Sequence, residues 1–115
     1  MLKVYEYEKC STCRKALQFL DRRKVPYARV SIVERPPTLP ELREMLGRVG
    51  DIRRLFNTSG QLYRELQVGK RLPAMSEAEA LALLAKHGKL IKRPFALGPG
   101  VALVGFQQAD WEKAF

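Results

Sequence analysis

The sequence has few side chains that could hold a metal ion. It contains two cysteines, Cys10 and Cys13, and one histidine, His87, among 115 residues. A zinc site needs three or four such ligands, and no second CxxC pair is available to complete one. The loop between Cys10 and Cys13 is also too short for a disulfide there to act mainly as a structural staple. Two interpretations of this CxxC pair remain: a redox-active dithiol, or two inert buried thiols.

Long hydrophobic runs are absent as well. The densest apolar stretch, Ala80 to Ala85, is far shorter than the roughly 20 residues that span a bilayer. The N-terminal residues lack the apolar core and small-residue cleavage site of a signal peptide. We therefore expect a cytoplasmic protein that has no membrane partner.

Acidic residues are scarce relative to basic ones. The chain has 12 Asp and Glu against 21 Lys and Arg, which gives a net charge of +9 and a pI near 9.9. Such an excess favours anionic partners, although arginines spread along the chain are equally typical of a solvated surface. No platform of interleaved aromatic and basic residues is present, so we do not expect direct nucleic-acid binding.

The N-terminal third has the pattern of a βαβ unit. Residues 3–7 alternate in polarity as a strand does, and residues 27–32 do so again. Between them, residues 12–23 place Ala16, Leu17 and Leu20 on one helical face, and Pro26 ends that helix.

The rest of the chain predicts a helical middle followed by a hairpin. Thr38 with Glu41, and Ser76 with Glu79, have the spacing of capping boxes that open two helices. The predicted elements are a helix from Leu39 closed by Gly47 or Gly50, short helices at 51–56 and 61–66, a helix from 77 to about 87 capped by Gly88, strands at 90–97 and 101–106 joined by the turn 98–100, and a last helix from Asp110 to Phe115.

The CxxC pair is best explained as a reactive dithiol. Cys10 precedes the first predicted helix, where unpaired backbone N–H groups stabilise a thiolate. Lys9, Arg14 and Lys15 add positive charge around it. Cys13 lies one helical turn away, so it can attack whatever Cys10 has bound. The pattern predicts an attacking thiol at Cys10 and a resolving thiol at Cys13.

A proline begins the predicted hairpin. In a βαβ chain followed by ββα, the strand that begins at Pro94 can lie beside the turn between the first strand and helix, which would bring Arg93 close to Cys10. The alternative is an ordinary proline at the edge of a strand.

Several segments together resemble one known family. The stretches are residues 5–15, 34–38, 55–60, 63–66 and 90–94. They are similar to the ArsC/Spx family, which comprises glutaredoxin-linked arsenate reductases and the Spx transcription regulators, and the similarity covers essentially the whole chain.

The resemblance implies an α/β, thioredoxin-like βαβ…ββα fold. It forms one domain of residues 1–115 with a helical insert at about 34–89. It also implies a reactive Cys10 and a cis-proline at Pro94. In the reductases the cysteine attacks arsenate, and glutathione and glutaredoxin release the product. We accordingly expect no bound cofactor, and glutathione with glutaredoxin, or thioredoxin, as electron donor.

The family's oxyanion clamp is only partly present. Of three arginines that hold arsenate in the reductases, Arg93 carries over, whereas Asn57 and Gly105 occupy the positions of the other two. Bidentate guanidinium contacts orient such an anion, so their loss weakens the arsenate interpretation. Lys9, Arg14 or Lys92 could substitute in part. The expected catalytic residues are Cys10, Cys13 and Arg93, and the expected substrate-binding residues are Ser11, Thr12, Arg14, Asn57 and Pro94.

The second cysteine points to a different relative. Glutaredoxin-linked reductases usually have serine at the position of Cys13, whereas Spx uses a CxxC pair as an oxidation switch. Spx binds the C-terminal domain of the RNA polymerase α-subunit, and Gly50 falls where its docking region has a glycine. The first hypothesis is a thiol/disulfide oxidoreductase acting on arsenate, a related oxyanion or a thiol substrate. The alternative is a redox-switched regulator that binds RNA polymerase.

Overall fold

The computed structural model describes residues 1–115 and contains one four-stranded mixed sheet with helices on both faces. The strands are β1 (Leu2–Glu6), β2 (Tyr27–Ser31), β3 (Phe95–Gly98) and β4 (Val101–Val104). Their order is β2-β1-β3-β4, with β2 parallel to β1 and the other two pairs antiparallel. This arrangement confirms the predicted α/β fold class.

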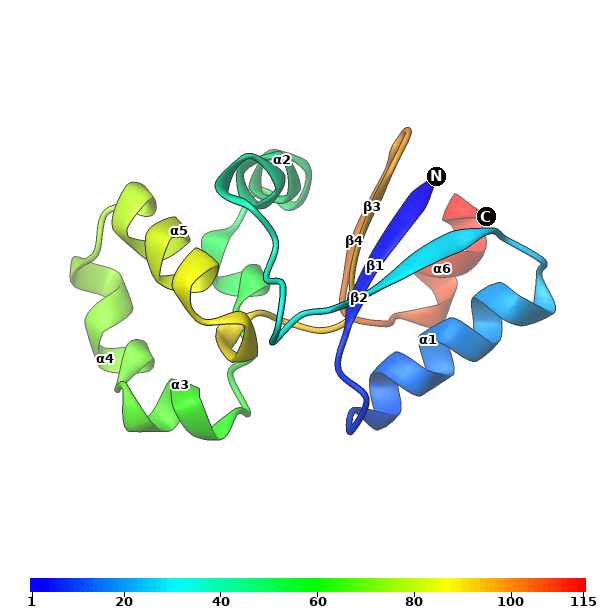
Figure 1. Ribbon diagram of the computed structural model, residues 1–115. Coiled ribbons are helices and arrows are strands. Elements are labelled where there is room, and N and C mark those ends of the chain that lie inside the picture. The colour runs from blue at the N-terminus through cyan, green and yellow to red at the C-terminus, as the bar shows by residue number, and fades with distance from the viewer.

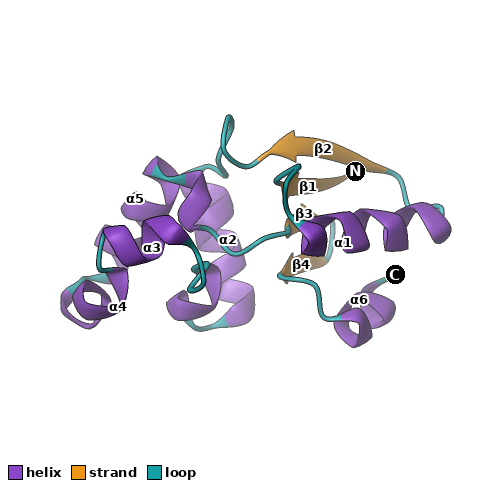
Figure 2. Cartoon of the chain, turned by 90° about the horizontal axis from the view of Figure 1, so that it is seen from below, coloured by secondary structure: helices purple, strands orange, loops and turns teal.

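Helices α1 (Ser11–Arg22) and α6 (Gln108–Ala114) cover one face of the sheet (Figure 1). The other helical segments lie on the opposite side, where they form a separate lobe in both ribbon views (Figure 2). They are α2 (Leu39–Val49), α3 (Gln61–Glu65), α4 (Val68–Arg71) and α5 (Glu77–Lys86), with 3₁₀ turns η1 (Ile52–Leu55), η2 (Leu72–Ala74) and η3 (Gly88–Leu90). None of the helices is long and apolar enough to span a bilayer.

Alternation along the strands divides the buried side chains into two clusters. Val4 and Ala96 pack with α1 and with Trp111 of α6, whereas Tyr5 and Phe95 pack against the helical lobe. Successive strand residues point to opposite faces, so a single sheet serves both clusters. The sheet therefore holds the lobe and α1 at defined positions on either side of it.

Both predicted capping boxes are present. The Thr38 side chain accepts from Glu41 N while Glu41 accepts from Thr38 N, and Ser76 and Glu79 do the same at the start of α5. At the other end of α2, Gly50 adopts a left-handed conformation with φ of 81° and ends the helix.

Four details of the predicted elements were wrong. Gly88 is not a left-handed cap; it begins η3, and His87 is the C-cap of α5. The first hairpin strand begins at Phe95 rather than Leu90, because residues 88–90 form η3 and Ile91 only bridges to Phe56. Gln107, not Asp110, is the N-cap of the last helix. Helix α4 was missed because its four residues, VGKR, are too few to show a periodic pattern.

Candidate active site

Cys10 is the N-cap residue of α1. Its backbone is extended, and its N–H donates to the carbonyl of Tyr7 at 3.0 Å. The Sγ atom accepts from the backbone N–H of Cys13 at 3.3 Å. The sulfur thus occupies the place that a serine or aspartate oxygen takes at many helix N-termini, and it receives an N–H that no carbonyl in the helix can satisfy.

The two thiols differ strongly in acidity. Partial burial alone would raise the pKa of Cys10. Hydrogen bonds from the thiol and the N–H of Cys13 outweigh this effect, together with the positive charge of Arg93 and a hydrogen bond from its side chain, and the pKa lies below its ordinary value. Burial and the neighbouring Cys10 sulfur raise the pKa of Cys13 to about 12. Cys13 is fully buried, whereas Cys10 is partly exposed. Cys10 is therefore the more acidic of the two thiols, and Cys13 is the one that keeps its proton more strongly.

The register of the sheet places Arg93 beside Cys10. Tyr5 of β1 pairs with Phe95 of the antiparallel β3, so the residues that precede β3 run alongside those that follow β1. The guanidinium of Arg93 lies 4.9 Å from the ring centroid of Tyr7. The Arg93–Pro94 peptide bond is cis, as the resemblance implies.

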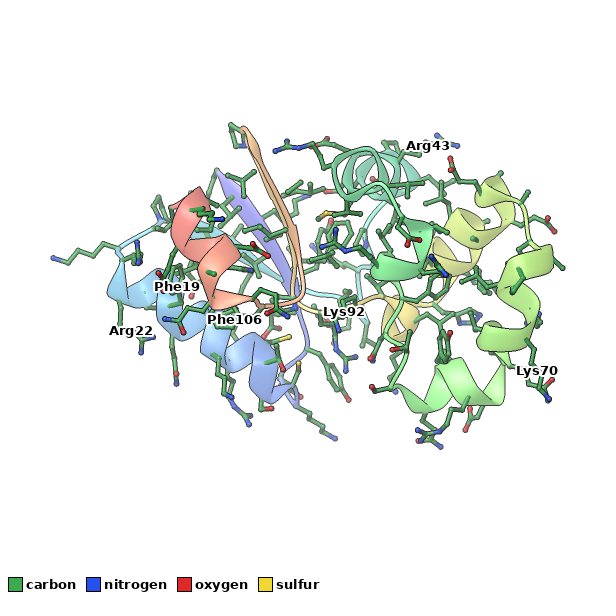
Figure 3. The ribbon with its side chains drawn as sticks, turned by 180° about the vertical axis from the view of Figure 1, so that it is seen from behind. Phe19, Arg22, Arg43, Lys70, Lys92 and Phe106 are labelled. Atoms are coloured by element: carbon green, nitrogen blue, oxygen red, sulfur yellow. The ribbon has the colours of Figure 1, made fainter.

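Cys10 lines a cleft of about 630 Å³ between the sheet and the helical lobe. Two backbone hydrogen bonds, Asn57 N to Leu90 O at 2.7 Å and Lys92 N to Leu55 O at 2.8 Å, bring residues 55–57 beside the segment that carries Lys92 and Arg93. Figure 3 places Lys92 between the two halves of the molecule. The lining residues are Cys10, Thr12, Arg53, Arg54, Phe56, Asn57, Thr58, Ser59, Lys92, Arg93, Val104, Gly105, Phe106 and Gln107.

The cleft carries positive charge without compensating carboxylates in its lining. Its cations are Arg53, Arg54, Lys92 and Arg93, and no aspartate or glutamate is among the lining residues. Arg53 is ion-paired with Asp51 at 3.1 Å outside the cleft, and Arg54 donates to the carbonyl of Val49 at 3.4 Å. Lys92 has no ion-pair partner. The arrangement suits a small anion next to the thiolate.

Not all the predicted site residues meet in the cleft. Cys10, Thr12, Asn57 and Arg93 line it together, and Cys13 lies buried beside Cys10. Three others lie elsewhere. Ser11 and Arg14 are exposed on α1, with the guanidinium of Arg14 3.4 Å from the carbonyl of Glu8, and the buried Pro94 does not reach the cleft surface.

Sequence reasoning missed Arg53 and Arg54. No local sequence pattern marks these two residues. They line the cleft because the 3₁₀ turn η1 is followed by an extended residue, Phe56, which sets the direction of the chain there. Thr58, Ser59 and Gln107 were also missed.

Gly105 leaves space for the side chain of Lys92. A Cβ at position 105 would lie 3.1 Å from Lys92 Cε, so glycine leaves the space that the lysine chain occupies. No group of three or more His, Cys, Asp or Glu side chains could hold a metal ion.

The chain is similar to proteins of known families over nearly its full length. It is 42% identical over 113 residues to the uncharacterised protein YusI of Bacillus subtilis, covering 97% of this chain and 96% of that one. An arsenate reductase of Neisseria meningitidis is 31% identical over 106 residues, 90% of this chain and 89% of that protein. The global transcriptional regulator Spx of Streptococcus pneumoniae is 25% identical, over 96% of this chain and 82% of the regulator.

Solved structures agree with these relatives. The crystal structure of a Bacteroides fragilis protein described as ArsC family related superposes with a TM-score of 0.92 at 41% identity, covering 97% of this chain and 95% of that one. The sequence model of the ArsC family matches residues 5–114. The chain therefore belongs to the ArsC family.

Proposed function

We propose that this protein is a thiol/disulfide oxidoreductase that acts on arsenate or a related oxyanion, with Cys10 as nucleophile and Cys13 as resolving thiol. One observation carries the proposal: Cys10, whose sulfur is hydrogen-bonded at the N-terminus of α1, lines a cleft that also contains four cationic side chains and no carboxylate. A thiolate and an oxyanion repel each other in water. A reaction between them needs positive groups that hold both.

Arg54 and Lys92 are the best candidates for the contacts that the family's missing arginines would make. Arg93 already lies beside Cys10, and Asn57 contributes an amide rather than a charge. Lys92 reaches the cleft along the space left by Gly105. The oxyanion clamp is thus supplied from η1 and from the segment before β3, rather than from positions 57 and 105.

The reaction balances with these two thiols and one external reductant. The Cys10 thiolate attacks arsenic(V), a bond forms between sulfur and arsenic, and one arsenate oxygen leaves as water after protonation. Cys13 then attacks the Cys10 sulfur and gives its proton to solvent. The sulfur–arsenic bond breaks with its electron pair on arsenic, which leaves as arsenite, and a Cys10–Cys13 disulfide remains.

The raised pKa of Cys13 fits the second step, because burial and the negative charge on Cys10 both raise it. Once Cys10 is bound to arsenic that charge is gone, so the Cys13 proton is lost more easily. Glutathione with glutaredoxin, or thioredoxin, would then reduce the disulfide. Such donors belong to the reducing cytoplasm, where we place the protein.

The test is arsenate-dependent consumption of reductant, measured with glutathione and glutaredoxin and, separately, with thioredoxin. The wild type should turn over with at least one donor, and Cys10→Ser should abolish turnover. With thioredoxin as donor and glutathione absent, Cys13→Ser should stop turnover after the Cys10 adduct, which intact-protein mass spectrometry would detect. No arsenate-dependent consumption with either donor would contradict the arsenate part of the proposal.

Arg54→Gln tests the clamp, with Arg43→Gln as its matched control. Arg43 is exposed on α2 and points away from the cleft (Figure 3). Loss of one charged hydrogen bond to the anion should lower kcat/KM roughly 10- to 100-fold for Arg54→Gln. Equal effects of the two substitutions would mean that Arg54 acts only through overall charge.

A redox-switched regulator that binds RNA polymerase is the second candidate. The supporting observation is Gly50, which is exposed at the end of α2 with open space around its Cα, next to the exposed Arg48. A glycine in this setting leaves room for a partner's backbone. A pull-down with the C-terminal domain of the polymerase α-subunit, in reduced and oxidised states, tests it. Binding in neither state would remove this candidate.

A further inference from the structure

A second pocket lies in the helical lobe beside the cationic cleft. It has a volume of about 500 Å³, and Ile52, Tyr63, Gly69, Leu72 and Pro73 line it. Arg53 and Thr58 line both this pocket and the cleft that contains Cys10. Figure 1 shows α3 and the N-terminal end of α1 at the same lower edge of the molecule.

The two spaces differ in chemistry. The cleft at Cys10 is lined mostly by polar and positively charged side chains, whereas two aliphatic side chains, one aromatic ring and one proline line much of the second pocket. Either volume falls within the range of pockets that hold organic ligands, which is roughly 300–1,000 Å³. A ligand that filled both would carry an anionic group and an apolar body.

Aromatic packing holds one wall of the second pocket in place. The ring of Tyr63 packs edge-on against the buried Phe56, with ring centroids 6.3 Å apart. A Cβ added at Gly69 would lie 3.4 Å from the Tyr63 hydroxyl oxygen. An alanine at this position of α4 would therefore sit in ordinary van der Waals contact with Tyr63 and add one methyl group to this wall.

We propose that the organic substrate of Cys10 is a disulfide that carries a carboxylate and an apolar body, with the carboxylate on the cations of the cleft and the apolar body in the pocket of Ile52, Tyr63 and Leu72. This proposal rests on the thiol chemistry proposed above and names a substrate class for it. Oxyanions and such disulfides would share the cations, but only the disulfide would use the second pocket.

The reaction balances without a further oxidant. The Cys10 thiolate attacks one sulfur of the substrate disulfide, a mixed disulfide forms, and the first organic thiolate leaves. Cys13 attacks the Cys10 sulfur and loses its proton to solvent, the second organic thiolate leaves, and the protein holds a Cys10–Cys13 disulfide. Two electrons have passed from the protein dithiol to the substrate, and an external dithiol restores the protein.

The test compares three small disulfides in stopped-flow measurements. The disulfide of para-mercaptobenzoate has both a carboxylate and an aromatic ring. The disulfide of para-mercaptobenzamide has the ring without the charge, and the disulfide of thioglycolate has the charge without the ring. Each rate constant is divided by that of free N-acetylcysteine thiolate with the same compound, which removes intrinsic reactivity. The normalised rate should be highest for the mercaptobenzoate disulfide, by about fivefold or more over each of the others.

Two variants locate the effect. Gly69→Ala narrows the pocket and favours helix, and Leu72→Asn makes its wall polar. Leu72→Asn should remove most of the advantage of the mercaptobenzoate over the thioglycolate disulfide, and Gly69→Ala, which adds a single methyl group, should reduce it less; both should leave the thioglycolate rate unchanged. Gly47→Ala is the matched control, since Gly47 is also helical but faces open space. An advantage that survives both pocket variants, or equal normalised rates for all three compounds in the wild type, would overturn the proposal.

A parallel measurement separates this proposal from the one on which it rests. Alkylation of Cys10 by neutral iodoacetamide depends on the thiolate and not on either binding space. Rapid alkylation at neutral pH together with equal disulfide rates would overturn the substrate class alone. Alkylation no faster than that of free cysteine would overturn the thiol chemistry itself.

Discussion

At the scale of single residues, the proposed chemistry depends on a sulfur at a helix cap. Cys10 accepts the Cys13 N–H, as a capping side chain does, and has Arg93 nearby, whose position is in turn supported by the ring of Tyr7. Tyr7 also accepts the Cys10 N–H through its carbonyl. Tyr7 thus contacts both the backbone N–H of Cys10 and the guanidinium of Arg93.

Replacing Tyr7 tests this arrangement. Tyr7→Leu removes the ring beneath Arg93 but keeps the backbone contact, so the pKa of Cys10 should rise toward its ordinary value. Its reaction with an anionic disulfide near neutral pH should slow about two- to fivefold. Ultraviolet titration of the thiolate gives the pKa directly. Tyr7→Phe, which keeps the ring, should behave as wild type; a shift equal to that of Tyr7→Leu would show that the hydroxyl, not the ring, is responsible.

At the scale of elements, two helices that begin with the same capping box have different roles. The hydrogen bonds of Glu79 of α5 at this end of the helix are with its own cap residue, Ser76. Glu41 of α2 caps Thr38 and also accepts from Tyr5 Oη at 2.7 Å and from Lys3 Nζ at 3.1 Å, both on β1. The first turn of α2 is therefore tied to the sheet, and with it the lobe that forms one wall of the cleft.

The difference between these two glutamates can be measured. Burial alone would raise the pKa of Glu41, but hydrogen bonds from Thr38, Tyr5 and Lys3 lower it. A carboxyl whose pKa is lower in the folded protein stabilises it above the unfolded pKa. That stability is lost as pH falls through the folded pKa.

Glu41→Gln should lower the free energy of unfolding at pH 7 by about 1–2 kcal/mol. This deficit relative to wild type should shrink on acidification below the unfolded pKa of a glutamate. Urea denaturation at several pH values measures both effects. Glu79→Gln should cost less, because it lacks the ties to β1. Identical losses for the two variants would show that the contacts with the sheet add nothing to stability.

Gly88 joins two elements by close approach. It begins η3, and a Cβ there would lie 1.8 Å from the backbone carbonyl oxygen of Ile32, just after β2. Gly88→Ala should therefore destabilise the protein by about 3 kcal/mol. Gly47→Ala, in open space on α2, should instead stabilise it by about 0.5–1 kcal/mol. Urea unfolding of both variants tests the pair, and a neutral Gly88→Ala would show that β2 and η3 can separate freely.

At the scale of the whole molecule, the site lies where the helical lobe meets the sheet. One apolar cluster joins the lobe to one face of the sheet, and the other joins α1 and α6 to the opposite face. Cys10 is supplied from one side and Arg53 and Arg54 from the other. The chain as a whole has a net charge of +9, and the cleft itself adds four cations, so anions should be attracted to the protein from a distance.

Ionic strength separates this long-range attraction from local chemistry. The rate of Cys10 with an anionic disulfide should fall about threefold or more as ionic strength rises from about 0.02 to about 0.5 M. Alkylation by neutral iodoacetamide should change little over the same range. A salt dependence shared by both reagents would mean that salt acts on the thiolate or the fold, not on attraction of the substrate.

Local patterns in the sequence were sufficient to predict several features. The alternation of residues in β1 and β2, the periodicity of α1 and both capping boxes depend on neighbours within a few positions, and the structure has all of them. The placement of Cys10 before α1 is equally local. Patterns failed where a segment was too short to repeat, as in α4, or where a tertiary contact outweighed a local preference, as at Gly88.

The sequence by itself determined which helices and strands form at the start of the chain and that a cysteine caps the first of those helices, because hydrogen bonds and side-chain periods over three or four residues decide both. Only the tertiary structure decided what surrounds that cysteine. The β1–β3 register puts Arg93 beside it, and the pairing of residues 55–57 with 90–92 adds Lys92, Arg53 and Arg54. These contacts join residues 33 to 94 positions apart, and their free energy comes from packing and burial across the whole fold, which local spacing does not encode.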